Sequence, residues 1–301
     1  MSVPITVHPL SDGFAAALSG VDMRLARDAS IANEVVDILK KYPVCVVRHA
    51  EPLSDEEHIA FSHLLGPVEA KPVLTVSARG QNRIPHHEII DQSNLNETGE
   101  IYADEDRRLA FKRANRLWHT DMSFHSVRAT YSLLSAHVLP PDGGPATELA
   151  DMRAAYDALP RDTKSKIDGL VAEHSYWHSR VAGGGPEATP EERASRPPAR
   201  HPLVHDRHGR KALYLASHAS HASHIEGLPT EESRVLLDEL MAFATRPQFV
   251  YAHHWRVGDV LIWDNLATMH RARPFNDRHQ IRDVRRTTCR EADRRGQISP
   301  G

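Results

Sequence analysis

Residues 118–121 have the sequence WHTD, and the motif WDN at residues 263–265 precedes His270 far downstream. Residues two apart in an extended segment point to the same side, so His119 and Asp121 can reach one metal ion together. A third ligand from a distant strand would place two histidines and one carboxylate on one face of the ion, an arrangement typical of non-haem Fe(II) oxygenases. The sequence predicts that His270 is this third ligand and that the remaining coordination positions accept a 2-oxo acid and O₂.

Three other histidine–glutamate pairs have a similar short spacing, so the spacing alone is weak evidence for metal binding. The pair at residues 119–121 differs from them in three ways. It alone contains aspartate, it adjoins an apolar segment rather than a turn, and a downstream histidine followed by arginines completes a site. The competing segments are His49-Ala50-Glu51, His86-His87-Glu88 and His224-Ile225-Glu226.

Another candidate metal motif is the series His218, His221 and His224, whose spacing would align three imidazoles on one face of a helix for zinc. The segment holds little apolar material with which to bury a helix, and no set of carboxylates accompanies it. We expect a polar loop near the substrate opening rather than a zinc site.

Short apolar segments dominate the second half of the chain, and helical periodicity is concentrated earlier and at the sides. This order favours a mainly β fold with flanking helices, a β-sandwich or jelly roll in one domain spanning residues 1–301. Strands are expected within 5–23, broken at Gly13 and Gly20, and at 44–47, 131–139, 203–205, 212–215, 249–255 and 260–263, with a hairpin turn at 206–209.

Four segments combine helical periodicity with a start signal. Ser54 and Glu57 form a capping box for one of these helices, because each side chain can bond to the backbone N–H of the other. The expected helices cover residues 31–40 capped by Ser30, residues 55–65 closed by Gly66, residues 152–159 after Asp151, and residues 230–244 capped by Thr230.

Two long segments lack clear periodicity. Residues 67–116 contain many polar side chains, and residues 181–200 are rich in glycine, proline and charge. Loops of this length in a compact domain are usually functional or flexible. Both are therefore expected to be loop or lid segments.

The composition is that of a globular protein: of 301 residues, 40% are hydrophobic and 26% are charged, and the formal net charge is −3. No basic field favours nucleic acid or an anionic membrane as a partner. No apolar run approaches the roughly 20 residues that cross a bilayer. Residues 1–10 lack a secretory pattern, and two cysteines cannot form a disulfide framework. We expect a cytoplasmic protein that acts on a small organic anion; self-association as a homo-oligomer is left open.

Several motifs together resemble the taurine dioxygenase family, and most closely its 2,4-dichlorophenoxyacetate dioxygenase branch. The resemblance extends from about Ile5 to Thr288. It implies a double-stranded β-helix, cupin-like fold and an enzyme that binds Fe(II), with 2-oxoglutarate and O₂ as cosubstrates. Besides the two metal motifs, the matching segments are Gly143-Gly144 ahead of Thr147, DMRAAYDALP at 151–160, EHS at 173–175, HASH at 221–224, FVY at 249–251 and RDVRRT at 282–287.

The resemblance also implies roles for individual residues, which divide into a metal site, a cosubstrate site and a substrate site. The implied residues are His119, Asp121 and His270 for iron and catalysis, Thr147 and Arg282 for 2-oxoglutarate, and Asn115 and Arg286 for the substrate.

The spacing of the arginines agrees with these roles. A buried carboxylate of 2-oxoglutarate requires a paired cation, and the fork of an arginine is well suited to it. Arg282 and Arg286 lie four positions apart, which is an even spacing, so both can face the interior of one strand while Arg285 faces outward. Because the interval after His270 is one residue longer than in taurine dioxygenase, Arg285 competes with Arg286 for the substrate role.

The expected reaction is hydroxylation of a small anionic substrate, and an aryloxyalkanoate ether would be cleaved after hydroxylation. The main alternative is a sulfonate or alkyl sulfate dioxygenase with the same fold. A remote alternative is a non-catalytic metal-binding protein, which would need the triad but not the 2-oxoglutarate arginine. Trp118, beside a ligand, is expected to become oxidised when no substrate is present.

Overall fold

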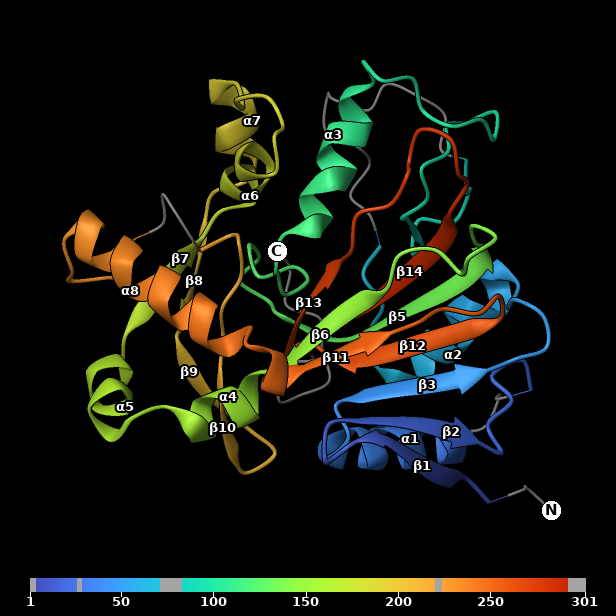
Figure 1. Cartoon of the computed structure of the whole chain (residues 1–301), viewed down its shortest axis with the longest axis horizontal. Coiled ribbons are helices and arrows are strands. Elements are labelled where there is room, and N and C mark those ends of the chain that lie inside the picture. The colour runs from blue at the N-terminus through green and yellow to red at the C-terminus, as the bar shows by residue number, and fades with distance from the viewer. Residues whose placement is uncertain (1–3, 26–28, 71–82, 220–223, 292–301) are drawn as a thin grey trace.

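Two β-sheets face one another in the computed structural model, which describes residues 4–25, 29–70, 83–219 and 224–291 (Figure 1). The larger sheet has seven strands in the order β1-β2-β3-β12-β5-β14-β4, and the smaller sheet has three in the order β11-β6-β13. The large sheet comprises β1 (Thr6–Ser11), β2 (Ala15–Ser19), β3 (Val44–Arg48), β12 (Asp259–Asp264), β5 (Ala129–Val138), β14 (Asp283–Arg290) and β4 (Ile90–Asp91), and the small sheet comprises β11 (Val250–His253), β6 (Thr147–Asp151) and β13 (Thr268–Ala272).

Strand β12 shows how the large sheet is buried on both faces. Val260 and Ile262 pack into a core beneath the helices, whereas Leu261 and Trp263 pack into a second core that also contains Leu149 of the small sheet. Successive side chains point to opposite faces of a strand. A strand that is covered on both sides has apolar residues at every position, and this continuous apolar run is the pattern from which the strand was predicted.

Helices cover the outer face of the large sheet. Helix α1 (Ala29–Lys41) and helix α2 (Asp55–Leu65) contribute Val35, Leu39 and Phe61 to the core that lies against this face. The capping box of α2 is present as predicted: the Glu57 N–H donates to Ser54 Oγ at 3.2 Å, and the Ser54 N–H donates to Glu57 at 2.8 Å.

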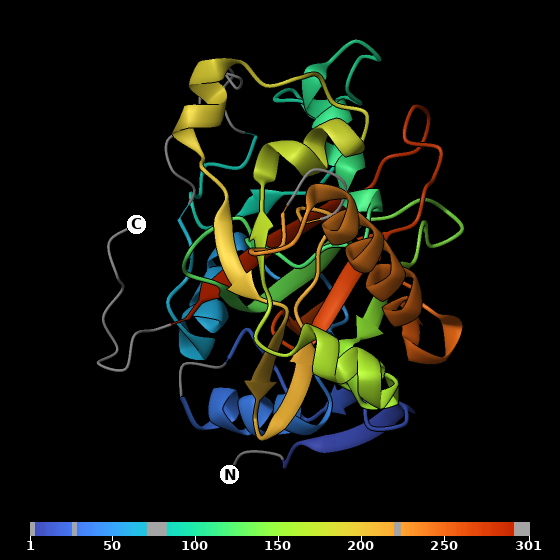
Figure 2. The ribbon, with the colours of Figure 1, turned by 90° about the vertical axis from the view of Figure 1, so that its left-hand side faces the viewer.

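The outer face of the small sheet is covered by helix α4 (Met152–Ala158) and helix α8 (Thr230–Ala244), which face the viewer in Figure 2. Met152 and Leu237 pack there with Met269 of β13. Asp151 caps α4 as predicted, because its carboxylate accepts from the N–H groups of residues 153 and 154. The neighbour of Met269 in β13, His270, therefore points to the other face, into the space between the sheets.

Two predicted helix caps are wrong. Helix α1 begins at Ala29, so Ser30 is already inside it. Helix α8 begins at Thr230, and its N-cap is Pro229, in an extended conformation without a side-chain cap. Glu231 and Glu232 occupy the first turn instead, where negative charge is favourable beside the positive end of the helix dipole.

The two predicted loop segments contain regular structure that the sequence analysis missed. Residues 67–116 include β4, helix α3 (Arg107–Arg113) and a 3-10 turn η1 (Ala114–Arg116), although residues 71–82 lie outside the described residues. Residues 181–200 include helix α7 (Pro190–Ser195), which begins with a capping box between Thr189 and Glu192. Parts of both segments therefore form helices or strands rather than loops.

The predicted hairpin is present as β9 (Val204–Arg207) and β10 (Arg210–Leu213), and its turn is His208-Gly209, both with positive φ. No helix of the described residues is long and apolar enough to cross a bilayer. The remaining elements are α5 (Arg161–Ile167), β7 (Val171–His174), α6 (Tyr176–Ala182), β8 (Ala199–Pro202) and η2 (Pro247–Phe249).

Candidate metal centre

His119 and His270 lie opposite each other across an isolated antiparallel bridge. The His119 N–H donates to the His270 carbonyl at 2.9 Å, and the His270 N–H donates to the His119 carbonyl at 2.8 Å. Opposed residues in an antiparallel pair place their side chains on the same face. The two imidazoles accordingly lie with ring centroids 4.2 Å apart.

The orientation of the His119 ring leaves one nitrogen available to a metal. Its Nδ1 lies 2.8 Å from the Leu117 carbonyl, so Nδ1 carries the proton and Nε2 has a free lone pair. A metal-binding histidine commonly uses its other nitrogen in this way. Burial lowers the pKa of His119 to about 4, which keeps the ring neutral near pH 7.

Asp121 is held by an inner polar network. Ser132 Oγ donates to Asp121 Oδ2 at 2.7 Å, and the Asp121 N–H donates to Asn265 Oδ1 at 3.3 Å. Asn265 in turn donates to Ser132 Oγ at 2.9 Å and accepts from Trp263 Nε1 at 2.9 Å. Trp263 and Asn265 of the WDN motif thus hold the groups that bond to Asp121. The hydrogen bond from Ser132 was not predicted, because nothing local in the sequence indicates it.

Arg286 supplies a positive charge beside this carboxylate, and its Nη1 donates to Asp121 Oδ1. Burial opposes ionisation of Asp121, but Arg286 and the two imidazoles outweigh it and hold the pKa of the carboxyl below its ordinary value. The carboxylate is therefore in the charged form that a metal ion requires.

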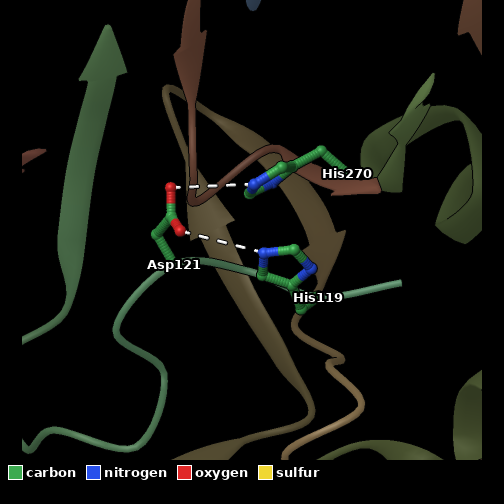
Figure 3. A group of neighbouring side chains, drawn as sticks. All are labelled: His119, Asp121 and His270. Carbon is green, nitrogen blue, oxygen red and sulfur yellow. Dashed lines mark ion pairs between the residues drawn. The ribbon is translucent and has the colours of Figure 1, made fainter. Parts of the chain in front are cut away.

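The three predicted ligands point toward one another (Figure 3). Asp121 Oδ1 lies 4.0 Å from His119 Nε2, and Asp121 Oδ2 lies 3.8 Å from His270 Nε2. One ligand atom from each residue lies within 4.8 Å of the others, and all three residues are buried. Two imidazoles and one carboxylate match the donor set that Fe(II) takes in facial-triad sites.

Within the described part of the chain, these three residues are the only group of three or more histidine, cysteine or carboxylate side chains spaced to hold a metal ion. The competing pairs beginning at His49, His86 and His224 have no such third partner there. His221 lies outside the described residues. His218 lies in a turn and is buried beside the centre, with its ring centroid 6.2 Å from that of His119.

A cavity between the sheets brings the proposed 2-oxoglutarate residues to the same place. His119, His270, Thr147, Arg282 and Arg286 all line it. Arg282 is only 6% exposed, and its Nε has no hydrogen-bond partner among the described residues. Burial lowers the pKa of its guanidinium to about 10, and no neighbouring carboxylate offsets this. Such a cation fits an anionic group that is supplied from outside the chain.

Arg285 lies on the opposite side of β14 from Arg286, as the even spacing predicted. It donates to Asp55 at 2.8 Å and to Asp283 at 3.1 Å. Arg286 faces the inner cavity, and Arg285 belongs to ion pairs on the outer face. This geometry favours Arg286 over Arg285 as the arginine available to a small molecule.

A second cavity adjoins the triad on the side of α6 and is lined by both His119 and Asp121. Its walls include two aromatic rings, Phe124 and Tyr176, whose centroids lie 4.9 Å apart. The further lining residues include Asn115, Arg286 and three cations that the sequence analysis did not single out, Lys112, Arg180 and Arg196. The Asn115 side chain donates to Gln92 Oε1 at 2.8 Å.

A family model described as "Taurine catabolism dioxygenase TauD, TfdA family" matches residues 6–288. The chain belongs to this family. Members are dioxygenases, so the chain is an oxidoreductase with Fe(II) as its metal and 2-oxoglutarate as its cosubstrate. The jelly-roll fold predicted from the sequence is confirmed.

Individual TauD, TfdA relatives match nearly the whole chain. The alpha-ketoglutarate-dependent 2,4-dichlorophenoxyacetate dioxygenase of Cupriavidus pinatubonensis is 41% identical over 286 residues, which cover 94% of this chain and 97% of the relative. An alkylsulfatase of Acinetobacter baylyi is 29% identical over 297 residues, which cover 94% of this chain and 84% of the relative. The solved structure of AAD-2 in complex with Mn(II) and N-oxalylglycine has a TM-score of 0.85 and 39% identity, and the match covers 96% of this chain and 97% of that one.

Proposed function

We propose that this dioxygenase hydroxylates an aryloxyalkanoic acid on the carbon between the ether oxygen and the carboxylate. When bound, Fe(II) with 2-oxoglutarate and O₂ supplies an oxidant that inserts one oxygen atom into a C–H bond, while the other oxygen atom enters succinate and CO₂ is released. The hydroxylated carbon then bears both an ether oxygen and a hydroxyl group. This hemiacetal breaks down to a phenol and an oxo acid.

The observation that carries the cosubstrate assignment is the buried guanidinium of Arg282, which shares a cavity with the imidazoles of His119 and His270. Under the proposal, His119, Asp121 and His270 hold Fe(II). Arg282 pairs with the distal carboxylate of 2-oxoglutarate, because a charge-assisted pair offsets the cost of burying that group.

Thr147 is proposed to help Arg282. Its hydroxyl oxygen accepts from Trp255 Nε1 at 3.0 Å, so the hydroxyl hydrogen is free to point to another acceptor. Thr147 is buried and lines the same cavity as Arg282. The hydroxyl and the guanidinium can therefore serve the two oxygens of one carboxylate.

The second cavity supports an aromatic acid as the substrate. Phe124 and Tyr176 offer an apolar wall to an aryl ring, and Arg180 and Arg286 offer cations to a carboxylate. Asn115 adds an amide near the same place, in keeping with its predicted substrate role. A small carboxylate must lie close to the triad for its neighbouring carbon to react, which favours cations that share a cavity with His119 and Asp121.

The relatives' names favour the same substrate class, since the Cupriavidus relative is named for an aryloxyacetate. The alkylsulfatase likeness keeps sulfate esters and sulfonates as the second candidate. The triad and the arginines would serve either anion, so the aromatic wall is the feature that separates the two candidates.

The test is a panel of aryloxyacetates, sulfonates and alkyl sulfates, scored by succinate release together with the organic product. We expect aryloxyacetates to give phenol and succinate in equal amounts. Faster turnover of alkyl sulfates would instead favour the second candidate. A protein that binds Fe(II) but consumes no 2-oxoglutarate with any acid would support the non-catalytic alternative. His119→Ala and Asp121→Ala serve as inactive controls, and unchanged turnover in either would remove that residue from the site.

A further inference from the structure

Asn94 lies directly against the backbone that carries Arg282. Its side-chain Oδ1 accepts from the Arg282 N–H at 2.9 Å, and its own N–H donates to the Arg282 carbonyl at 3.3 Å. The side chain of Asn94 is only 4% exposed. Although the two residues are far apart in the sequence, Asn94 therefore forms hydrogen bonds with both the N–H and the carbonyl of the Arg282 backbone.

The amide nitrogen of Asn94 holds the loop that leads to Arg282. Nδ2 donates to the Asp277 carbonyl at 2.7 Å and to the Gln280 carbonyl at 2.9 Å. A side-chain amide has two N–H donors, and both are used here. One side chain thus fixes three points along residues 277–282, just before β14 begins.

The carboxylate of Asp277 joins the same loop to the wall of the cosubstrate cavity. It accepts from Arg113 Nε at 3.0 Å and from Arg116 Nη2 at 2.5 Å. These arginines belong to α3 and η1, which come from the segment that also contains Asn94. The loop before Arg282 is consequently tied to residues 94–116 at both its backbone and its side chain.

The Arg282 guanidinium itself has no such restraint. Among the described residues its Nε has no hydrogen-bond partner, and its guanidinium carbon lies 5.9 Å from the centre of the Trp255 ring. Its place in the cavity is therefore determined by its backbone. A misplacement of about 1 Å at a binding group can be costly even when the contact itself is retained.

We propose that Asn94 is a positioning residue for 2-oxoglutarate: it fixes the backbone of Arg282 so that the guanidinium meets the distal carboxylate of the cosubstrate. This inference rests on the role of Arg282 in the proposed function. Asn94 also lines this cavity, but its side-chain oxygen and both amide hydrogens are bonded to the backbone of residues 277–282. The proposed effect of Asn94 on cosubstrate binding therefore passes through Arg282.

The experiment measures binding of two keto acids to the Fe(II)-loaded enzyme by calorimetry without oxygen. 2-Oxopentanoate is 2-oxoglutarate with a methyl group in place of the distal carboxylate, so it does not need Arg282. We expect Asn94→Ala to weaken 2-oxoglutarate binding about tenfold, equivalent to about 1.4 kcal/mol, and to leave 2-oxopentanoate binding unchanged. In an Arg282→Met background, Asn94→Ala should cause no further loss. Asn94→Asp, which keeps the acceptor but loses both donors, is measured in parallel in case the alanine variant does not fold.

Asn96→Ala is the matched control, because among the described residues the Asn96 side chain bonds only within its own turn, to Thr98 and Glu100. It should bind both keto acids as the wild type does. Equal weakening of both keto acids by Asn94→Ala, or a loss that persists in the Arg282→Met background, would overturn the inference. A wild-type enzyme that binds both keto acids equally would instead overturn the proposed role of Arg282, before any variant is compared.

Discussion

The guanidinium of Arg286 donates to the carboxylate of Asp121, so the negative ligand of the metal centre is already paired with a cation across the cavity. Removing one partner of a buried ion pair leaves an uncompensated charge. We predict that Asp121→Ala lowers the free energy of unfolding of the metal-free protein by about 3 kcal/mol, measured by urea titration.

His119→Ala is the control for this prediction. Burial keeps the His119 ring neutral by lowering its pKa to about 4, so removal of the ring leaves no buried charge without a partner. It should destabilise the metal-free protein less than Asp121→Ala does. Equal losses in the two variants would mean that the Arg286 pair contributes little to stability.

The two neighbouring arginines of β14 should respond very differently to substitution. Arg285→Gln removes only outer ion pairs, with Asp55 and Asp283, and its side chain is 20% exposed. We expect its KM for 2-oxoglutarate and for the acid substrate to stay within about twofold of wild type, with a stability loss of about 1 kcal/mol. Arg286→Gln should abolish most substrate hydroxylation. Steady-state kinetics on both variants decides the assignment, and a loss in Arg285→Gln as large as that in Arg286→Gln would reverse it.

Arg180 on α6 is predicted to contribute to recognition of the substrate carboxylate. Its guanidinium carbon lies 4.8 Å from the centre of the Tyr176 ring, in the cavity that also contains Asp121. We expect Arg180→Gln to reduce the preference for an aryloxyacetate over its neutral carboxamide about tenfold, by loss of a charge-assisted pair. The measurement is kcat/KM for both compounds, with the KM for 2-oxoglutarate expected to stay constant.

Arg246→Gln is the matched control for Arg180. Its guanidinium also lies over an aromatic ring, 4.3 Å from the centre of Phe243, but it does not line either cavity at the triad. It should retain the full preference for the acid. An Arg180→Gln enzyme that discriminates as well as this control would exclude Arg180 from carboxylate recognition.

His58 should make the stability of the fold sensitive to acid. Burial, with a further contribution from His137, lowers the pKa of His58 from 6.5 to about 3. Between pH 6.5 and pH 3 the unfolded chain therefore binds more protons at this residue than the folded protein does. The free energy of unfolding consequently decreases as the pH falls from 6.5 toward 3. This group alone contributes a slope approaching about 1.4 kcal/mol per pH unit.

Urea titrations between pH 7 and pH 4 would measure that slope. His58→Gln should reduce it, whereas His87→Gln, at an exposed position, should leave it unchanged. An unaltered slope in His58→Gln would show that another group dominates the acid response.

The parts of this protein that could be predicted are those determined by short-range patterns. The two-residue spacing was enough to pair His119 with Asp121. Arg282 and Arg286 line the same cavity, but strand alternation does not explain this, because Arg282 precedes β14 and the register shifts between Asp283 and Val284. The capping box of α2 was equally local. The box that begins α7 was visible too, at Thr189 and Glu192, but the glycine and proline around it suggested a loop.

The roles of Asn94, Ser132 and Arg180 could not be predicted in this way. Asn94 is defined by bonds to residues 277–282, and Ser132 by its place between Asp121 and Asn265. The role predicted for Arg180 depends on the position of α6 beside the cavity. Each depends on which elements meet in space, and a single sequence contains no local signal for that.

The bridge between His119 and His270 has a consequence for how the protein is made. A nascent chain that has not yet reached His270 holds only two of the three ligands, and the backbone of His119 lacks its partner. All three ligands can therefore hold iron only after His270 has been synthesised, so a product truncated before His270 would leave the ribosome without the means to retain its metal.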